Sequence, residues 1–83
     1  MQYIYPAIFK ANSDGTYTIT FPDLPGCISE GKNLSNALHM AQQALMQWIV
    51  YLESKNEQVP GATDIHCIEA PASGFVNFVS ADI

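Results

Sequence analysis

The carboxylate side chains are the first candidates for chemistry in this sequence, which holds eight Asp and Glu residues. A metal-dependent nuclease needs several of them to converge on divalent cations from neighbouring elements. Asp14 falls in a turn, Asp23 in a proline-rich loop and Asp82 near the C-terminus, and the long apolar segment after Asn33 holds no acid before Glu53. The spacing therefore predicts no metal site and no metal-dependent nuclease activity.

Nucleophilic and phosphate-binding patterns are also missing. Cys27 and Cys67 could each be paired with His39 or His66, but no spacing marks an activated thiol. The five glycines lie at separate turns and never cluster into a phosphate-binding loop. No signal peptide is visible, so we expect a cytoplasmic protein with reduced cysteines. Because these motifs are missing, we also expect a buried Cys, no catalytic residue and no cofactor.

Charge and length restrict the classes of partner. The chain has 83 residues and a formal net charge of −5, with three Lys and no Arg. Phosphate backbones are bound through clustered cations, so nucleic acid is a poor partner for this chain. The aromatic residues of the first strands are therefore better interpreted as core than as a surface that stacks bases. No apolar run approaches the length of a membrane span. An acidic surface favours a basic protein partner, and so small a domain favours a homo-oligomer.

The elements follow from local patterns. Strand-favouring residues over 3–10 and an alternating run over 16–21 flank the turn Asn12-Ser13-Asp14-Gly15 and predict a β-hairpin. Pro6 cannot donate to a ladder, so one edge of the first strand must be free or bulged there. Residues 27–30 predict a short third strand. Asn33 is an N-cap candidate, and apolar residues spaced by three and four from Leu34 to Leu52 predict a helix of about twenty residues on one face of a sheet.

Residues 55–74 form a long connection, with weak strand character over 64–69, before a last strand over 75–83. Strand–helix–strand crossovers prefer parallel placement, so we expect the last strand to lie parallel to a hairpin strand. The predicted fold class is α+β, with the order β-β-β-α-β and a mixed four-stranded sheet. Apolar residues flank the helix stripe and either broaden the core or serve self-association: Met40, Met46, Val50 and Tyr51.

Several motifs together give the chain a resemblance to a known family. They are Tyr5-Pro6-Ala7, Asp14-Gly15, the string Phe21-Pro22-Asp23-Leu24-Pro25-Gly26-Cys27, Gly31, and the helix pattern from Leu34 through Trp48. On these residues the chain resembles the HicB-like antitoxin family, UPF0150-type, most strongly over residues 3–52 and over nearly the whole length. The resemblance implies a partial RNase H-like fold without the nuclease carboxylates.

The resemblance also implies a non-enzymatic antitoxin of a type II toxin–antitoxin pair, which binds a HicA-like mRNA-cleaving toxin and occludes it. Many relatives add a C-terminal DNA-binding segment. This chain ends at Ile83, directly after the predicted last strand, so it is either one of the short members of the family or a chain cut before that segment. We expect a single domain over 1–83, with that segment absent and no DNA binding of its own. The alternative is a stand-alone oligomeric domain that binds RNA or a small ligand.

The rigid turn after Phe21 is the candidate contact with a toxin. Its residues and the short strand that follows present the expected contacts Asp23, Leu24, Pro25 and Glu30. A turn stiffened by proline loses little freedom on binding. The alternative is that Leu24 and the prolines only pack the edge of the sheet.

Overall fold

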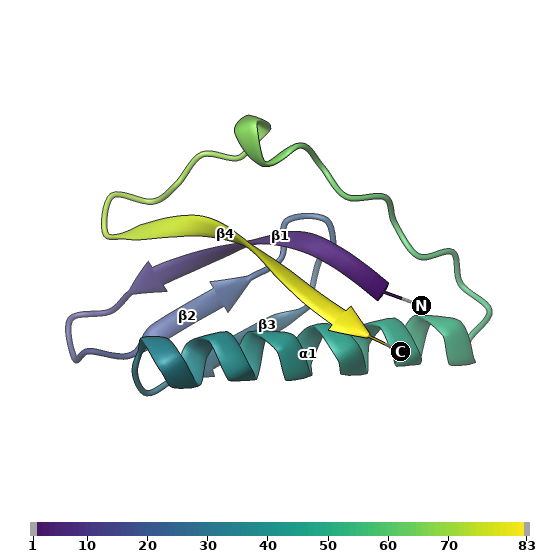
Figure 1. Cartoon of the computed structure of the whole chain (residues 1–83), viewed down its shortest axis with the longest axis horizontal. Coiled ribbons are helices and arrows are strands. Elements are labelled where there is room, and N and C mark those ends of the chain that lie inside the picture. Colours follow the sequence, from purple (N-terminus) through teal and green to yellow (C-terminus); the bar gives the residue numbers. More distant parts are fainter. Residues whose placement is uncertain (1, 83) are drawn as a thin grey trace.

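A computed structural model describes residues 2–82 (Figure 1). It has one four-stranded sheet in the order β3-β2-β1-β4 and one long helix packed on one face. The elements are β1 (Gln2–Ala11), β2 (Tyr17–Thr20), β3 (Ile28–Gly31), α1 (Leu34–Ser54), a short 3-10 helix η1 (Ile65–Cys67) and β4 (Gly74–Asp82). The α+β class and the element order are confirmed. Ile83, the last residue of the predicted final strand, lies outside the described residues.

The hairpin turn is built as the sequence predicts. Gly15 has a φ of +90°, which favours glycine. The Asp14 carboxylate accepts hydrogen bonds from the backbone N–H and the hydroxyl of Thr16, and these bonds hold the pKa of that carboxyl below its ordinary value. The Asn12 amide donates to the hydroxyls of Thr16 and Thr18, so side chains close both sides of the turn.

The direction of β4 corrects the expected mixed sheet. β4 pairs antiparallel with β1 over its whole length, from Gln2 opposite Asp82 to Lys10 opposite Gly74. The preference for parallel placement applies where a helix carries the chain directly back to the starting end of the sheet. Here residues 55–73 run back along the sheet after α1 has ended (Figure 1), so β4 starts at the opposite end and all pairings are antiparallel.

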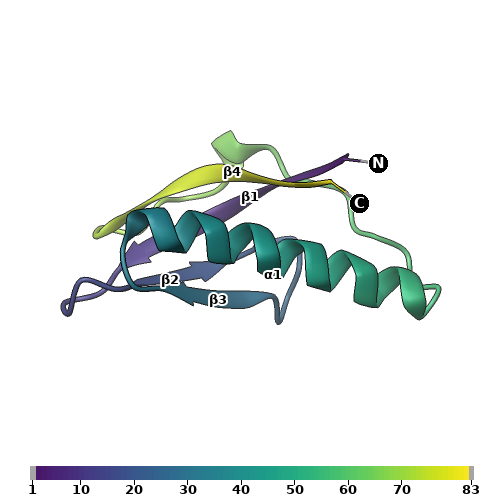
Figure 2. The same cartoon turned by 60° about the horizontal axis from the view of Figure 1, so that its bottom comes forward.

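The connection also covers a face of the sheet. It passes on the side away from α1 (Figure 2), and the weak strand predicted over 64–69 is instead the turn η1, whose N-cap Asp64 accepts a bond from the His66 N–H. On β1, Tyr5 and Phe9 belong to the core under the helix, while Pro6 on the opposite face is under 2% exposed. The β1–β2 ladder begins only at Ile8, so Pro6 lies where β1 pairs with β4 alone, as its missing N–H requires.

The helix seals the other face and lies very close to β3. Asn33 is its N-cap and accepts a bond from the Asn36 N–H at 2.8 Å. Its buried stripe consists of Ala37, Ala41, Leu45, Ile49 and Leu52. The spacing by three and four is as predicted, but Leu34 and Leu38, at the start of the predicted stripe, are each 42% exposed. At the start of the helix, a Cβ on Gly31 would lie 2.3 Å from the Cα of Ala37, so glycine alone lets β3 approach this closely.

Candidate protein-binding site

The loop between β2 and β3 is folded onto the core by its own turns. The Leu24 N–H donates to the Phe21 carbonyl at 3.0 Å, and the Cys27 N–H donates to the Leu24 carbonyl at 2.9 Å. This spacing by three buries Phe21, Leu24 and Cys27 and leaves Pro25 and Gly26 exposed. Leu24 is only 1% exposed and packs into the core, which favours the alternative that it is a structural residue of the loop.

The Asp23 side chain makes hydrogen bonds within the domain. Its carboxylate accepts hydrogen bonds from the backbone N–H of Thr63, at 2.9 Å, and from the Thr63 hydroxyl. Nearby, the Tyr5 hydroxyl donates to the Pro60 carbonyl. Burial, and then the charge of Asp23, raise the pKa of Tyr5. The connection is therefore fastened to the loop end of the sheet at two points. Sequence reasoning missed Thr63 because no local pattern links it to Asp23.

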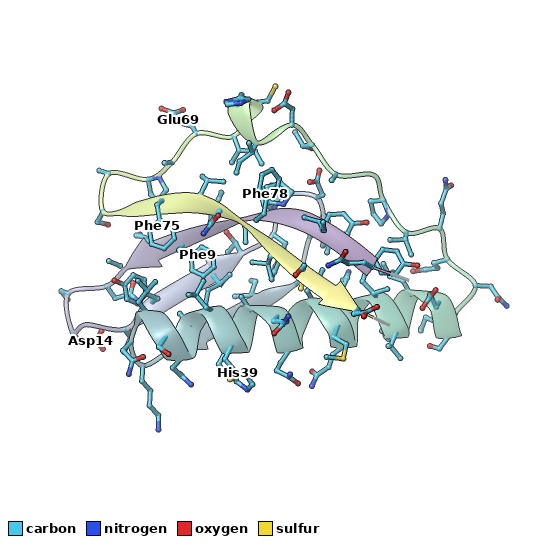
Figure 3. The ribbon with its side chains drawn as sticks, viewed as in Figure 1. Phe9, Asp14, His39, Glu69, Phe75 and Phe78 are labelled. Atoms are coloured by element: carbon cyan, nitrogen blue, oxygen red, sulfur yellow. The ribbon has the colours of Figure 1, made fainter. Side chains whose placement is uncertain are left out.

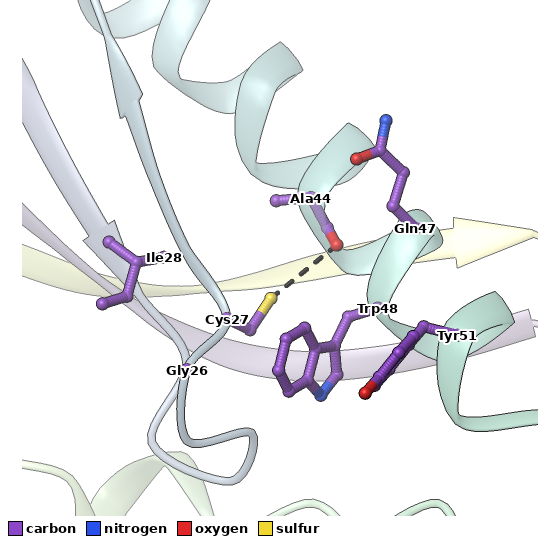
Figure 4. Close-up of a pocket in the computed structure, with 7 residues that line it drawn as sticks. All are labelled: Gly26, Cys27, Ile28, Ala44, Gln47, Trp48 and Tyr51. Carbon is purple, nitrogen blue, oxygen red and sulfur yellow. Dashed lines mark hydrogen bonds between the residues drawn. The ribbon is translucent and has the colours of Figure 1, made fainter. Parts of the chain in front are cut away.

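A hollow of about 320 Å³ opens between this loop and the C-terminal half of α1 (Figure 4). Its lining residues are Gly26, Cys27, Ile28, Ala44, Gln47, Trp48 and Tyr51. The Trp48 and Tyr51 ring centroids lie 5.7 Å apart and the rings are tilted by 41°. A Cβ on Gly26 would lie 3.1 Å from the Trp48 ring, so the loop and the indole fit closely. Helical periodicity assigned Trp48 to the core, and only the fold shows that one side of its ring borders the hollow.

The thiol in this hollow is partly buried and bonded to the helix. Burial raises the pKa of Cys27 to about 11, and its Sγ–H donates to the Ala44 carbonyl at 3.7 Å. At neutral pH the group therefore stays a protonated thiol. Cys27 is the buried cysteine that the sequence led us to expect, whereas Cys67 is exposed on η1.

Other groups that could do chemistry are scattered. Asp14 lies in the hairpin turn, His39 on the outer side of α1 and Glu69 on the connection (Figure 3). Within residues 2–82, no three His, Cys, Asp or Glu side chains gather closely enough to hold a metal ion. Phe9 and Phe75 stack with centroids 4.9 Å apart and belong to the interior of the sheet. Among the described residues, these groups therefore do not gather at the hollow.

Of the remaining predicted residues, Tyr51 lines this hollow and the others lie elsewhere on β3 and α1. Glu30 is exposed on β3. On α1, Met40 (37%), Val50 (49%) and Tyr51 (46%) are exposed, and Met46 is partly buried against the core. The Lys55 ammonium lies 5.0 Å from the Tyr51 ring centroid, so this ring already holds a cation over one face.

None of the helices in residues 2–82 has the length and apolar character needed to cross a membrane.

Comparison with known proteins places the chain among antitoxin-like sequences. A family model described as "HicB_like antitoxin of bacterial toxin-antitoxin system" matches residues 5–82. A UPF0150 protein of Thermoplasma acidophilum is 36% identical over 56 residues, which cover 68% of this chain and 81% of that protein. Antitoxin HicB 1 of Photorhabdus laumondii is 32% identical over 56 residues, 68% of this chain but only 36% of the antitoxin.

Solved structures share the fold. A toxin–antitoxin complex from Streptococcus pneumoniae contains a chain that superposes with a TM-score of 0.88 at 23% identity, covering 99% of this chain and 70% of that one. A chain of a HicA3 and HicB3 toxin–antitoxin complex superposes with a TM-score of 0.77 at 26% identity, covering 98% of this chain and 100% of that one. These chains have the same arrangement of sheet and helix.

Proposed function

Because this chain belongs to the HicB-like antitoxin family, we propose that it is the antitoxin of a type II toxin–antitoxin pair in the cytoplasm and neutralises a HicA-like toxin by binding it. The observation that carries the proposal is the family match over residues 5–82. Two similar chains in solved structures come from toxin–antitoxin complexes, which supports a partner of this class. The chain spans well under two thirds of the curated HicB antitoxins that it matches, so the proposal concerns this domain.

Binding, not chemistry, is the mechanism that the residues support. Within residues 2–82 no three His, Cys, Asp or Glu side chains gather to hold a metal ion, and burial raises the pKa of the Cys27 thiol, which supports binding over catalysis. A net charge of −5 attracts a basic protein and repels RNA. We propose that the exposed parts of the β2–β3 loop and β3, with Pro25 and Glu30 as contacts and Asp23 beside them, cover the toxin's catalytic surface.

The charge at Glu30 gives the direct test of this surface. Glu30→Lys should weaken binding of the toxin encoded beside this chain by about fivefold, roughly 1 kcal/mol, because a reversed rim charge repels a basic partner. The measurements are rescue of growth on co-expression and the dissociation constant of the purified pair. Asp23→Lys is less suitable, because it would also release Thr63.

Glu69→Lys is the matched control, since it makes the same change of charge at an exposed residue of the connection. Equal rescue by the two folded variants would remove β3 from the interface. Failure of the wild-type domain to bind the adjacent gene product would refute the antitoxin proposal and favour a stand-alone binding domain.

We also propose that the domain self-associates through the outer flank of α1. Met46 and Val50 lie one turn apart on one flank of the helix, and Met40 and Tyr51 lie on the other. Val50 and Tyr51 are nearly half exposed, so apolar area is left uncovered in the single chain. Light scattering at high micromolar concentration should show a dimer or larger species, and Val50→Lys should shift it to the monomer. A wild-type monomer at that concentration would contradict the proposal.

A further inference from the structure

β3 is an edge strand, and the parity of its hydrogen bonds shows which residues face outward. The bond from the Asn12 N–H to the Thr16 carbonyl continues the β1–β2 ladder, so Thr18 and Thr20 point their main-chain groups at β1. Tyr17 and Ile19 therefore point theirs at β3, where their partners are Gly31 and Ser29.

The other two residues of β3, Ile28 and Glu30, must then direct their N–H and C=O groups away from the sheet. Each offers one donor and one acceptor along the free edge. Ile28 is also 62% exposed, the largest exposure among the bulky hydrophobic residues described.

Side chains bond part of the opposite edge of the sheet, whereas this edge has no such bonds among residues 2–82. On β4, the Phe78 N–H donates to the Asn77 Oδ1 at 2.9 Å, and the Ser80 carbonyl accepts from the Gln42 Nε2 at 3.0 Å. In residues 2–82 no comparable bond covers the outward groups of Ile28 and Glu30. The outward groups of β3 are thus open to another strand, while part of the β4 edge is already bonded.

The helix lies along this open edge, and two hollows remain between the helix and β3. The Ser29 hydroxyl donates to the Met40 carbonyl at 3.4 Å, which fixes the spacing between β3 and α1. On one side of this contact lies the hollow with Trp48 and Tyr51, and on the other lies a second hollow of about 430 Å³ bordered by Glu30 and Met40. An edge strand beside a helix, with pockets for alternate side chains, is the arrangement that captures an extended peptide by strand addition.

We propose that the toxin inserts an extended segment along the outward edge of β3 and places a Lys or Arg side chain in the Trp48–Tyr51 hollow. This inference rests on the proposed function and specifies the mode of binding. The occupant is a basic segment because the chain carries −5, and because the hollow is bordered by the Trp48 and Tyr51 rings, whose faces attract cations. Main-chain bonds to Ile28 and Glu30 supply the register, and the aromatic hollow selects the cation.

Amide hydrogen exchange tests the strand addition directly. In a complex with the toxin, purified as a catalytically inactive variant, the Ile28 and Glu30 amides should exchange at least about tenfold more slowly than in the free domain. The Phe78 amide on the β4 edge should be unchanged and serves as the internal control. Trp48 is the single tryptophan, so incorporation of 5-fluorotryptophan into this chain alone gives a fluorine signal that should shift on binding.

Proline scanning separates the main chain from the side chain. Ile28→Pro removes an outward donor but leaves the β2–β3 ladder intact, and it should weaken toxin binding about tenfold. Val76→Pro removes an outward donor from β4 in the same way and should leave the affinity unchanged. Circular dichroism establishes that both variants are folded before their affinities are compared.

A charge pair at Gln47, which borders the hollow, tests the cationic occupant. Gln47→Lys should weaken binding about fivefold and Gln47→Glu should strengthen it by a similar factor. Ala72→Lys, on the exposed connection, controls for the net charge of the chain. Equal effects of Gln47→Lys and Gln47→Glu would show that the hollow does not take a cation and would overturn that part of the proposal.

The outcomes separate the two proposals. If the wild-type domain does not bind the toxin, the antitoxin function fails and the binding mode fails with it. If it binds, but the Ile28 and Glu30 amides stay unprotected and Ile28→Pro binds as tightly as wild type, strand addition alone is refuted. Protection of these amides that grows with the concentration of this chain, without toxin, would make a second copy the occupant and overturn the assignment to the toxin.

Discussion

Gly31→Ala should lower the free energy of unfolding by about 3 kcal/mol, the upper end for overpacking a close contact. The added Cβ would lie 2.3 Å from the Ala37 Cα and 2.5 Å from its backbone N. Both are backbone atoms of the helix, so they cannot move aside as the end of a flexible side chain could. The steric overlap can be relieved only if β3 moves away from α1. Because a small domain is stabilised by only a few kcal/mol in total, much of the population would unfold at physiological temperature.

Urea unfolding followed by circular dichroism measures this effect. Gly61→Ala is the matched control, because a Cβ at Gly61 has nothing within 4 Å and its φ is not positive. That variant should be neutral or more stable by up to about 0.5 kcal/mol, since alanine restricts the unfolded chain. Similar midpoints for the two variants would show that β3 does not lie as close to the helix as the structure has it.

Leu24→Ala should cost about 3 kcal/mol of stability, because the side chain is 1% exposed and its removal leaves a cavity in the core. Pro25→Ala, one residue further on, should change the free energy of unfolding by less than about 0.5 kcal/mol, because Pro25 is exposed. The two substitutions therefore distinguish the structural part of the loop from its contact part.

Toxin affinity completes this comparison. Pro25→Ala should weaken binding about threefold, through greater freedom of the loop before binding. Leu24→Ala should weaken it only in proportion to the unfolded fraction, so its affinity should recover at lower temperature or with an osmolyte. A stable Leu24→Ala protein, or one that has lost binding while fully folded, would contradict the burial of Leu24.

Local patterns in the sequence determined the elements and much of their placement. Asn33 before Leu34 marked the start of the helix, and the spacing by three and four identified the buried stripe from Ala41 to Leu52, although Leu34 and Leu38 are exposed. The Asp14-Gly15 turn joined the first two strands. These features depend on residues within about one helical turn or one hairpin. Such neighbours interact in the same way whatever the position of the segment in the tertiary structure. The motifs around Phe21–Cys27 pointed to the family for the same reason, because the loop is one continuous string.

Only the tertiary structure decided the features that join distant segments. β4 is antiparallel because the connection doubles back, and nothing in residues 74–82 encodes its direction. Leu24 was indistinguishable from a contact residue until the turn buried it, and Asp23 meets Thr63 across 40 positions of sequence. The open edge of β3 and the hollow beside Trp48 exist only where loop, strand and helix meet. Their energies come from packing and hydrogen bonds between residues far apart in the chain, which no short window of sequence contains.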